Sequence, residues 1–141
     1  MDNSLQTIML VDDDEASIFF NTEIIEECGL VDHVEVFQDP VEALGFVSHS
    51  SDAADSGAHR PDVILLDLNM PKMSGWEFMD AYRESAPRDM RDIPVVVLTS
   101  SSNQRDVEKA STTEGIVAYV VKPLSEAKLK KIIAFISEDV E

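Results

Sequence analysis

Five short apolar runs alternate with segments of helical spacing, and this alternation is the feature that most constrains the fold. Each run has the length of a strand, and the segments between them carry apolar residues three and four positions apart. Strands and helices that alternate with short connections form a parallel sheet with helices on both faces. We therefore expect an α/β fold of five βα units, (βα)5, in a doubly wound three-layer sandwich around a five-stranded parallel sheet. The predicted strands are residues 8–11, 34–37, 63–66, 94–98 and 117–121.

Capping residues indicate where several helices begin and end. Asp39, which precedes a proline, is the expected N-cap of one helix, and Ser74 is the expected N-cap of the next. Gly29 is expected to end the first helix in the left-handed conformation, and Gly115 to end a helix over about 104–113. The apolar helix faces predicted from the spacing contain Ala16, Phe20, Ile24 and Cys28; Val41, Leu44 and Val47; Phe78, Met79 and Tyr82; and Leu129, Ile132, Ile133 and Ile136.

Two segments are predicted to be loops. Residues 87–92 are charged, and residues 49–60 are small, polar and about twice as long as a typical connection. His49 and His59 flank the longer loop, but two histidines so far apart are a weak metal signal, so we interpret them as solvated. Cys28 has no cysteine to pair with, and we interpret it as a small core residue near a helix end.

The composition limits the number of domains and the classes of ligand. The 141 residues, with 44% hydrophobic content, suit one domain over residues 1–141 with its own core. No apolar run approaches the roughly 18 residues of a membrane span, and no basic signal-peptide start precedes Asp12, so we expect a cytoplasmic protein. A net charge of −17 without a basic stripe argues against nonspecific binding of nucleic acid.

Chemically active side chains follow four of the five predicted strands. The carboxyl ends of parallel strands meet at one edge of the sheet, where ligands bind. Three carboxylates gathered there repel each other unless a cation relieves the repulsion. Mg²⁺ fits best, because it takes one or two carboxylates and phosphate oxygens while it keeps several waters. The residues are Asp12 and Asp13, Asp67, Thr99 and Lys122.

The same set of side chains suits the transfer of a phosphoryl group. A metal, an ammonium group and hydrogen-bond donors stabilise the charge of a phosphoryl group in transfer. Lys122 and Thr99 supply the ammonium and the hydroxyl. Asp67 is then the expected nucleophile, and the expected product is an aspartyl phosphate.

Four segments carry a resemblance to a known family. They are residues 10–14 (LVDDD), 65–75 (LLDLNMPKMSG), 97–100 (VLTS) and 119–123 (YVVKP). With these segments in order, the chain resembles the receiver domain of two-component response regulators over nearly its whole length. Its layout is close to that of stand-alone receivers such as the chemotaxis regulator. The resemblance implies a flavodoxin-like sheet with strand order 2-1-3-4-5, and a phosphorelay switch rather than an enzyme.

The resemblance also implies roles for individual residues. Asp67 would accept the phosphoryl group from a histidine kinase or a histidine phosphotransfer protein. Asp13, Asp67 and the backbone carbonyl of Asn69 would ligate Mg²⁺, and Asp12 would reach the ion mostly through water. Lys122 would pair with the phosphoryl group.

A second set of implied roles concerns switching and phosphoryl lifetime. Thr99 would hydrogen-bond the phosphoryl group, and Tyr119 would turn inward when Thr99 moves toward it. Asn69 and Ser101 occupy positions that flank the attacking water in the family. The peptide bond from Lys122 to Pro123 would be cis, which X-Pro bonds tolerate. Trp76 lies within reach of the site mouth, and we interpret it as a partly packed aromatic residue at a helix start.

The resemblance further implies a downstream protein partner. Because no DNA-binding or enzymatic domain follows residue 141, we expect signalling through protein contacts. The partner face would combine the helix over about 104–113, the strand 117–121 and the last helix. A solvated helix face is an alternative interpretation for its lysines. The side chains of that last helix face are Lys128, Lys130, Lys131, Ala134 and Phe135. The chain departs from the family in the longer loop at 49–60 and in Leu124, where many members have Phe.

Two other functions use a similar architecture. A phosphatase of the haloacid dehalogenase type also has an Asp nucleophile and Mg²⁺, but it usually needs a second Asp two residues later. Asn69 stands there, and Asn cannot act in general acid-base catalysis. A flavodoxin-like nucleotide or flavin binder should have a loop rich in Gly, Ser or Thr after the first strand. The acidic residues 12–14 stand there instead and would repel phosphate unless a metal ion intervened.

Overall fold

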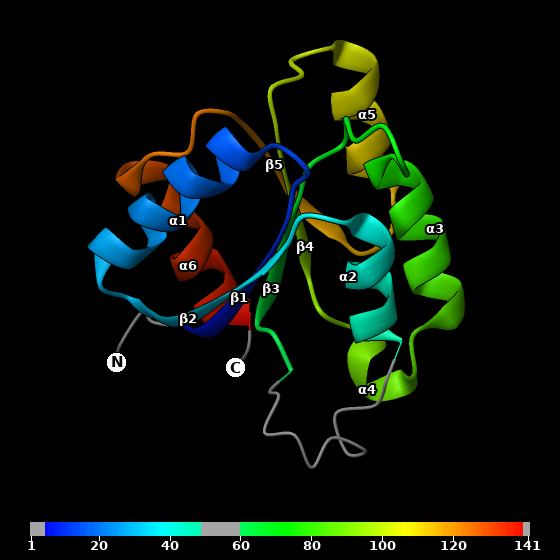
Figure 1. Ribbon diagram of the computed structural model, residues 1–141, viewed down its shortest axis with the longest axis horizontal. Helices are drawn as coiled ribbons and strands as arrows, with labels where there is room; N and C mark the ends of the chain where they lie inside the picture. Colours follow the sequence, from blue (N-terminus) through cyan, green and yellow to red (C-terminus); the bar gives the residue numbers. More distant parts are fainter. Residues whose placement is uncertain (1–4, 49–59, 140–141) are drawn as a thin grey trace.

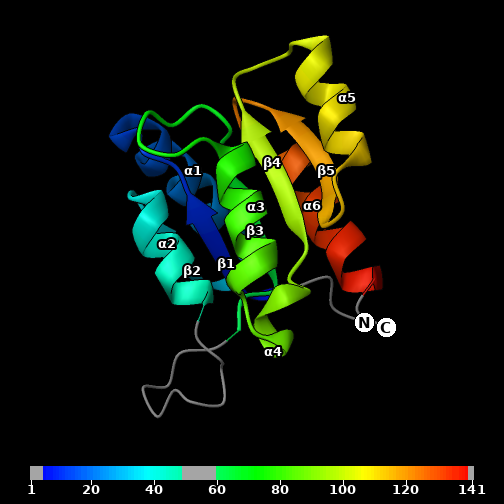
Figure 2. The same ribbon diagram turned by 90° about the vertical axis from the view of Figure 1, so that its right-hand side faces the viewer.

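A five-stranded parallel sheet forms the centre of the computed structural model, which describes residues 5–48 and 60–139 (Figures 1 and 2). The strand order is β2-β1-β3-β4-β5, which confirms the predicted fold class and order. The first two strands each begin three residues earlier than predicted. The strands are β1 (Leu5–Val11), β2 (Val31–Phe37), β3 (Val63–Leu66), β4 (Val95–Thr99) and β5 (Ile116–Val121).

Helices cover both faces of the sheet, so the predicted three layers are present. Helices α1 and α6 lie on one face, and α2, α3 and α5 lie on the other (Figure 1). Figure 2 looks onto the second face, with α3 in front of the sheet. The helices are α1 (Glu15–Cys28), α2 (Pro40–Val47), α3 (Gly75–Ser85), α4 (Arg88–Arg91), α5 (Gln104–Thr112) and α6 (Glu126–Asp139).

Alternate residues of the central strands fill two separate cores. Leu65 of β3 packs into the core beneath α1 and α6, whereas its neighbours Ile64 and Leu66 pack into the core beneath α2 and α3. A strand covered on both faces is therefore apolar at every position, as β3 is. The predicted apolar residues of α3 and α6 are all buried: Phe78, Met79, Tyr82, Leu129, Ile132, Ile133 and Ile136.

Three of the four capping predictions are confirmed, whereas α5 ends with Thr113 as its C-cap and not at the predicted Gly115. The side chain of Asp39 accepts a hydrogen bond from the Val41 N–H at the start of α2. Ser74 and Glu77 form a reciprocal capping box at the start of α3. Gly29 ends α1 with a φ of 72°, in the left-handed region that glycine tolerates best.

The predicted buried face of α1 is partly wrong. Phe20 is 46% exposed and Ala16 is also exposed, whereas Ile18 and Ile25 pack toward the sheet. Ile18, Phe19 and Phe20 are consecutive, so they cannot all face the core, and two overlapping stripes of helical spacing were possible. The same ambiguity affects α2, where the predicted Val41 is 51% exposed and the neighbouring Ala43 is buried.

The segment 87–92, predicted as a loop, contains the four-residue helix α4. Met90 of α4 is buried in the core, and its carbonyl oxygen accepts a hydrogen bond from the hydroxyl of Tyr82. These two contacts hold the segment, although its charges indicated only a loop.

The helix predicted over 104–113 ends one residue earlier, at Thr112. The loop 49–60 lies outside the described residues except for its last residue, and His49 and His59 lie there too.

Candidate active site

The strand register brings the predicted site residues to one edge of the sheet. The Asp67 N–H donates a hydrogen bond to the Val11 carbonyl at 3.0 Å, so Asp67 lies beside the end of β1. The Lys122 N–H donates to the Thr99 carbonyl at 2.8 Å, which joins the ends of β4 and β5. Four strands therefore deliver the residues at or just after their carboxyl ends to a common place, as the sequence predicted.

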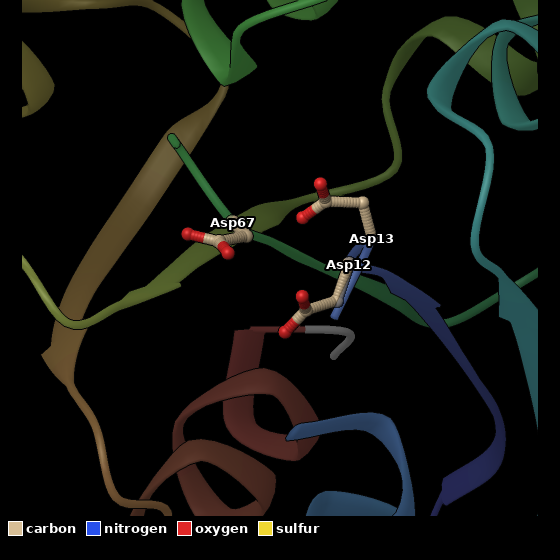
Figure 3. A group of neighbouring side chains, drawn as sticks. All are labelled: Asp12, Asp13 and Asp67. Atoms are coloured by element: carbon tan, nitrogen blue, oxygen red, sulfur yellow. The ribbon is translucent and has the colours of Figure 1, made fainter. Parts of the chain in front are cut away.

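Three aspartates form an acidic cluster at this edge (Figure 3). Asp12, Asp13 and Asp67 each offer one carboxylate oxygen, and these oxygens lie within 4.8 Å of one another. Asp12 is almost fully buried at 1% exposure, and its Oδ1 accepts a hydrogen bond from the Asp14 N–H at 3.0 Å. No residue in the described parts of the chain hydrogen-bonds the Asp13 carboxylate. One oxygen of Asp13 therefore lies in the cluster without a hydrogen-bond partner among the described residues.

Lys122 lies between two of the three carboxylates. Its Nζ is 2.7 Å from Asp12 Oδ2 and 3.4 Å from Asp67 Oδ2. Burial alone lowers the pKa of Lys122, but the hydrogen bond to Asp12 and the charges of both aspartates outweigh burial and leave that pKa raised. The lysine is therefore a firmly charged ammonium group.

Asp67 lies in a drier environment than a surface carboxylate. Burial raises the pKa of Asp67, and the charge of Asp12 acts in the same direction. Lys122, the Asn69 N–H and the Thr99 hydroxyl oppose this shift. The Asn69 N–H donates to Asp67 Oδ1 at 3.3 Å, and Thr99 is fully buried at the end of β4. A bound cation would lower the pKa of Asp67 further toward its ordinary value.

The donor set of the cluster suits a hard divalent cation. Asp12, Asp13 and Asp67 supply oxygen ligands, which Mg²⁺ prefers, and no sulfur or imidazole ligand belongs to this described group. Three carboxylates and one ammonium group leave a net charge of −2 at the site, equal and opposite to that of the cation. The residues present therefore fit Mg²⁺.

The predicted switch residues are linked to each other through the loop that follows β4. The Tyr119 hydroxyl donates a hydrogen bond to the Ser101 carbonyl at 2.7 Å. The Ser101 N–H donates to Thr99 Oγ1 at 3.3 Å, and the Ser101 hydroxyl donates to Asp106 Oδ2 at 2.7 Å. Tyr119 and Thr99 therefore contact the same residue, Ser101, from two sides.

Gly75 is a residue whose role sequence reasoning missed. A Cβ atom at this position would lie 2.7 Å from the Asp67 carbonyl oxygen and 2.9 Å from Leu68 Cα. The N–H of Gly75 also donates to the Leu68 carbonyl at 2.9 Å. The start of α3 therefore packs directly on the backbone of Asp67, and only glycine permits this approach. The sequence analysis used this glycine only as the last residue of the motif at 65–75.

Other predicted residues occupy places around the site. The Lys122–Pro123 peptide is cis, and Leu124 is buried in the core beneath α1 and α6. Trp76 is half-buried, with Lys109 Nζ 4.6 Å from its ring centroid. Cys28 is also partly buried against the core, as its interpretation required.

The predicted lysine face of the last helix is only partly present. Lys130 and Lys131 are exposed on α6, and Lys130 pairs with Glu126 one turn earlier. Phe135 is 48% exposed. Lys128 is different, because its ammonium group turns back and hydrogen-bonds backbone carbonyls of the chain itself.

Comparison with known families gives one extended match. The family described as "Response regulator receiver domain" matches residues 8–134. The response regulator Rcp1 from Synechocystis is 31% identical over 131 residues, which cover 93% of this chain and 86% of Rcp1. No helix in the described ranges is both long enough and apolar enough to cross a membrane.

Solved structures agree with the sequence match. The bacteriophytochrome response regulator RtBRR is 36% identical, with a TM-score of 0.75 over 94% of this chain and 78% of its own. The phosphorylated cyanobacterial phytochrome response regulator RcpA is 30% identical, with a TM-score of 0.71 over 96% of this chain and 93% of its own. The Mn²⁺-bound form of Rcp1 is also 30% identical, with a TM-score of 0.69 over 94% of this chain and 92% of its own.

Proposed function

The chain belongs to the response regulator receiver domain family, and on that premise we propose that it is a Mg²⁺-dependent switch phosphorylated on Asp67. Membership places the chain in two-component phosphorelay signalling. One observation gives the main support for Mg²⁺-dependent phosphorylation of Asp67. Asp67 is a buried carboxylate at the end of β3, with two further carboxylates and the Lys122 ammonium group around it.

Asp67 is the proposed phosphoacceptor. One of its carboxylate oxygens forms a bond to the phosphorus of a phosphohistidine on a histidine kinase or a histidine phosphotransfer protein. The P–N bond breaks, and its electron pair leaves with the imidazole. Hydrolysis later returns the Asp67 carboxylate and inorganic phosphate. The phosphorylated state of RcpA, a relative of similar fold, supports this proposal.

Asp12, Asp13 and Asp67 would hold the metal ion, together with the backbone carbonyl of Asn69. When bound, Mg²⁺ supplies positive charge that stabilises the phosphoryl oxygens in transfer. The gathering of three carboxylates within 4.8 Å of one another supports this assignment, as does the Mn²⁺-bound form of Rcp1.

Lys122 and Thr99 are proposed to contact the transferred group. Lys122 already lies 3.4 Å from Asp67 Oδ2, so its ammonium group can bind a phosphoryl oxygen on that atom. Thr99 is close enough to Asp67 to affect the pKa of its carboxyl group. The hydroxyl of Thr99 can donate to the phosphoryl group while Ser101 and Tyr119 follow its movement.

The readout is proposed to be a change of protein contacts. The Thr99–Ser101–Tyr119 chain connects the acceptor edge to β5 and to the start of α5, where Asp106 binds Ser101. Phosphorylation would shift an existing equilibrium of this segment. A downstream protein would then bind the face formed by α5, β5 and α6, where Phe135 is exposed.

Incubation with acetyl phosphate and Mg²⁺ tests the proposal by intact mass. The account expects a gain of one phosphoryl group that is absent with a chelator and absent in Asp67→Asn. A phosphatase of the dehalogenase type would release phosphate from many monoesters without a requirement for a protein donor. Steady turnover of such substrates would favour that alternative and count against the switch.

A further inference from the structure

Lys128, in the first turn of α6, turns its ammonium group back toward the loop between β5 and α6. Its Nζ donates hydrogen bonds to the carbonyl oxygens of Val121 at 2.7 Å and Pro123 at 3.0 Å. These carbonyls belong to the residues immediately before and after Lys122. The Lys128 side chain is half-buried, so its charge is committed to the loop rather than displayed on the surface of α6.

The local preferences of a helix do not explain a lysine at this position. A helix N-terminus carries partial positive charge, so acidic residues are favoured in the first turn and a lysine is disfavoured. Glu126 satisfies that preference one turn before Lys130, and Lys128 violates it. The backbone of Lys128 is satisfied separately, because its N–H donates to the hydroxyl of Ser125 at 3.1 Å. The hydrogen bonds from Lys128 Nζ to the Val121 and Pro123 carbonyls offset the unfavourable position of a lysine in the first turn of a helix.

The loop contacts hold the backbone of Lys122 on both sides. The Lys122 N–H is bound to the Thr99 carbonyl at the end of β4, and the two carbonyls that flank Lys122 are bound to Lys128. The Lys122 side chain therefore leaves a backbone that is fixed to both β4 and α6. From there its ammonium group reaches Asp12 and Asp67.

We propose that Lys128 is a positioning residue, which holds the β5–α6 loop so that the ammonium group of Lys122 stays beside Asp12 and within reach of Asp67. The expected effect of Lys128 on phosphorylation rests on the function proposed above. Its expected effect on the position of Lys122 does not depend on that function. Lys128 touches neither the acceptor nor the acidic cluster and acts only through Lys122. A small displacement of a group that contacts the reacting atoms is enough to slow a reaction considerably.

Three variants separate this role from general effects on the helix. Lys128→Met keeps the apolar stem and removes the charge and the donors. Lys128→Arg keeps a cation whose several N–H groups can reach two carbonyls. Lys130→Met removes a charge from the same helix at an exposed position whose partner is Glu126. If Lys128→Met does not fold, Lys128→Gln takes its place, because its amide retains a donor.

The first readout is the NMR signal of the Lys122 ε-methylene group in metal-free protein. Lys128→Met should move this signal, while Lys130→Met should leave it in place and Lys128→Arg should restore most of its position. An unchanged Lys122 signal in Lys128→Met would overturn the proposal. This readout needs neither metal nor phosphate, so it decides the placement of Lys122 even if the wild type proves unable to accept phosphate.

The second readout is the rate of phosphorylation by acetyl phosphate at saturating Mg²⁺. Lys128→Met should react about tenfold more slowly than the wild type, and Lys128→Arg should recover most of the rate. Mg²⁺ affinity, followed by Trp76 fluorescence, should stay unchanged, because Lys128 contacts none of the three aspartates. A wild-type rate in Lys128→Met would overturn the role in transfer, whatever the NMR signal shows. A wild type that no donor phosphorylates would instead refute the proposed function.

Discussion

Lys122 Nζ lies 2.7 Å from Oδ2 of Asp12, a carboxylate that is only 1% exposed. The ammonium charge balances one of three neighbouring carboxylate charges, so a divalent cation bound by the cluster would balance the other two. The ammonium group therefore has two tasks: it stabilises the acidic cluster without metal, and it remains within reach of Asp67.

Removal of this ammonium group should destabilise the metal-free protein. Lys122→Met leaves Asp12 and Asp67 buried without a cationic partner, so we expect the free energy of unfolding to fall by about 1–3 kcal/mol. Mg²⁺ should then raise the free energy of unfolding of the variant more than that of the wild type. Urea unfolding with and without Mg²⁺ measures both effects, with Lys130→Met as the exposed control. Equal Mg²⁺ effects in variant and wild type would contradict the charge balance described for the site.

A methyl group at position 75 should disturb the acceptor. Gly75→Ala places a Cβ 2.7 Å from the Asp67 carbonyl oxygen, so α3 must move, at a cost of about 1–3 kcal/mol in unfolding free energy. The phosphorylation rate should fall as well, because the backbone of Asp67 would shift. Gly45→Ala in α2 is the matched control, since a Cβ there meets no described atom within 4 Å apart from its chain neighbours and the backbone of its own helix. The two variants can be compared by urea unfolding, and equal stability would argue against the close packing of α3 on Asp67.

Loss of one cluster carboxylate should abolish metal-linked stability. Mg²⁺ that binds only the folded protein stabilises it by about 1.4 kcal/mol at ten times its dissociation constant. Asp13→Asn should lose most of this gain, because Asp13 is the carboxylate whose charge no described residue balances. Asp80→Asn, an equal charge change at an exposed position of α3, should keep it. Thermal melts across a Mg²⁺ series make the comparison, and a full Mg²⁺ effect in Asp13→Asn would place the metal elsewhere.

Stability should fall at high pH because of Tyr82. Burial raises the pKa of Tyr82 to about 12, against 10.0 for an exposed tyrosine. Since the folded-state pKa is raised, its contribution is fully present below pH 10 and is lost as the pH rises to about 12. The loss is at most about 2.7 kcal/mol in unfolding free energy. Urea unfolding at pH 9.5 and pH 11 should show a smaller decrease in Tyr82→Phe than in the wild type, and equal decreases would assign the effect to other groups.

The sequence predicted the sheet and the strand-end residues because both depend on local pattern. Four of the five apolar runs end where their strands end, and β4 continues one residue further to Thr99, so Asp67 and Lys122 could be placed from the runs alone. Parallel pairing then brought them together, as the contact between Lys122 and Asp67 confirms. The prediction needed no side-chain detail, only the rule that parallel strands end at one edge.

The misplaced features depend on packing between distant segments. Which stripe of α1 faces the sheet was undetermined, since Ile18 and Phe20 both fit a helical spacing. The helix at 88–91 exists because Met90 enters the core and Tyr82 binds its carbonyl, which the charges around it do not reveal. Lys128 was grouped with the surface lysines, although its bond partners lie five and seven residues earlier in the chain.

The most direct test of the central claim is the identity of the modified residue. Protein phosphorylated with acetyl phosphate and Mg²⁺ is reduced with borohydride, which converts an aspartyl phosphate to homoserine, and the digested peptides are sequenced by mass spectrometry. The account predicts homoserine at position 67 and unmodified aspartate at positions 12 and 13. Homoserine at either of those positions, or phosphorylated protein with unmodified Asp67, would contradict it.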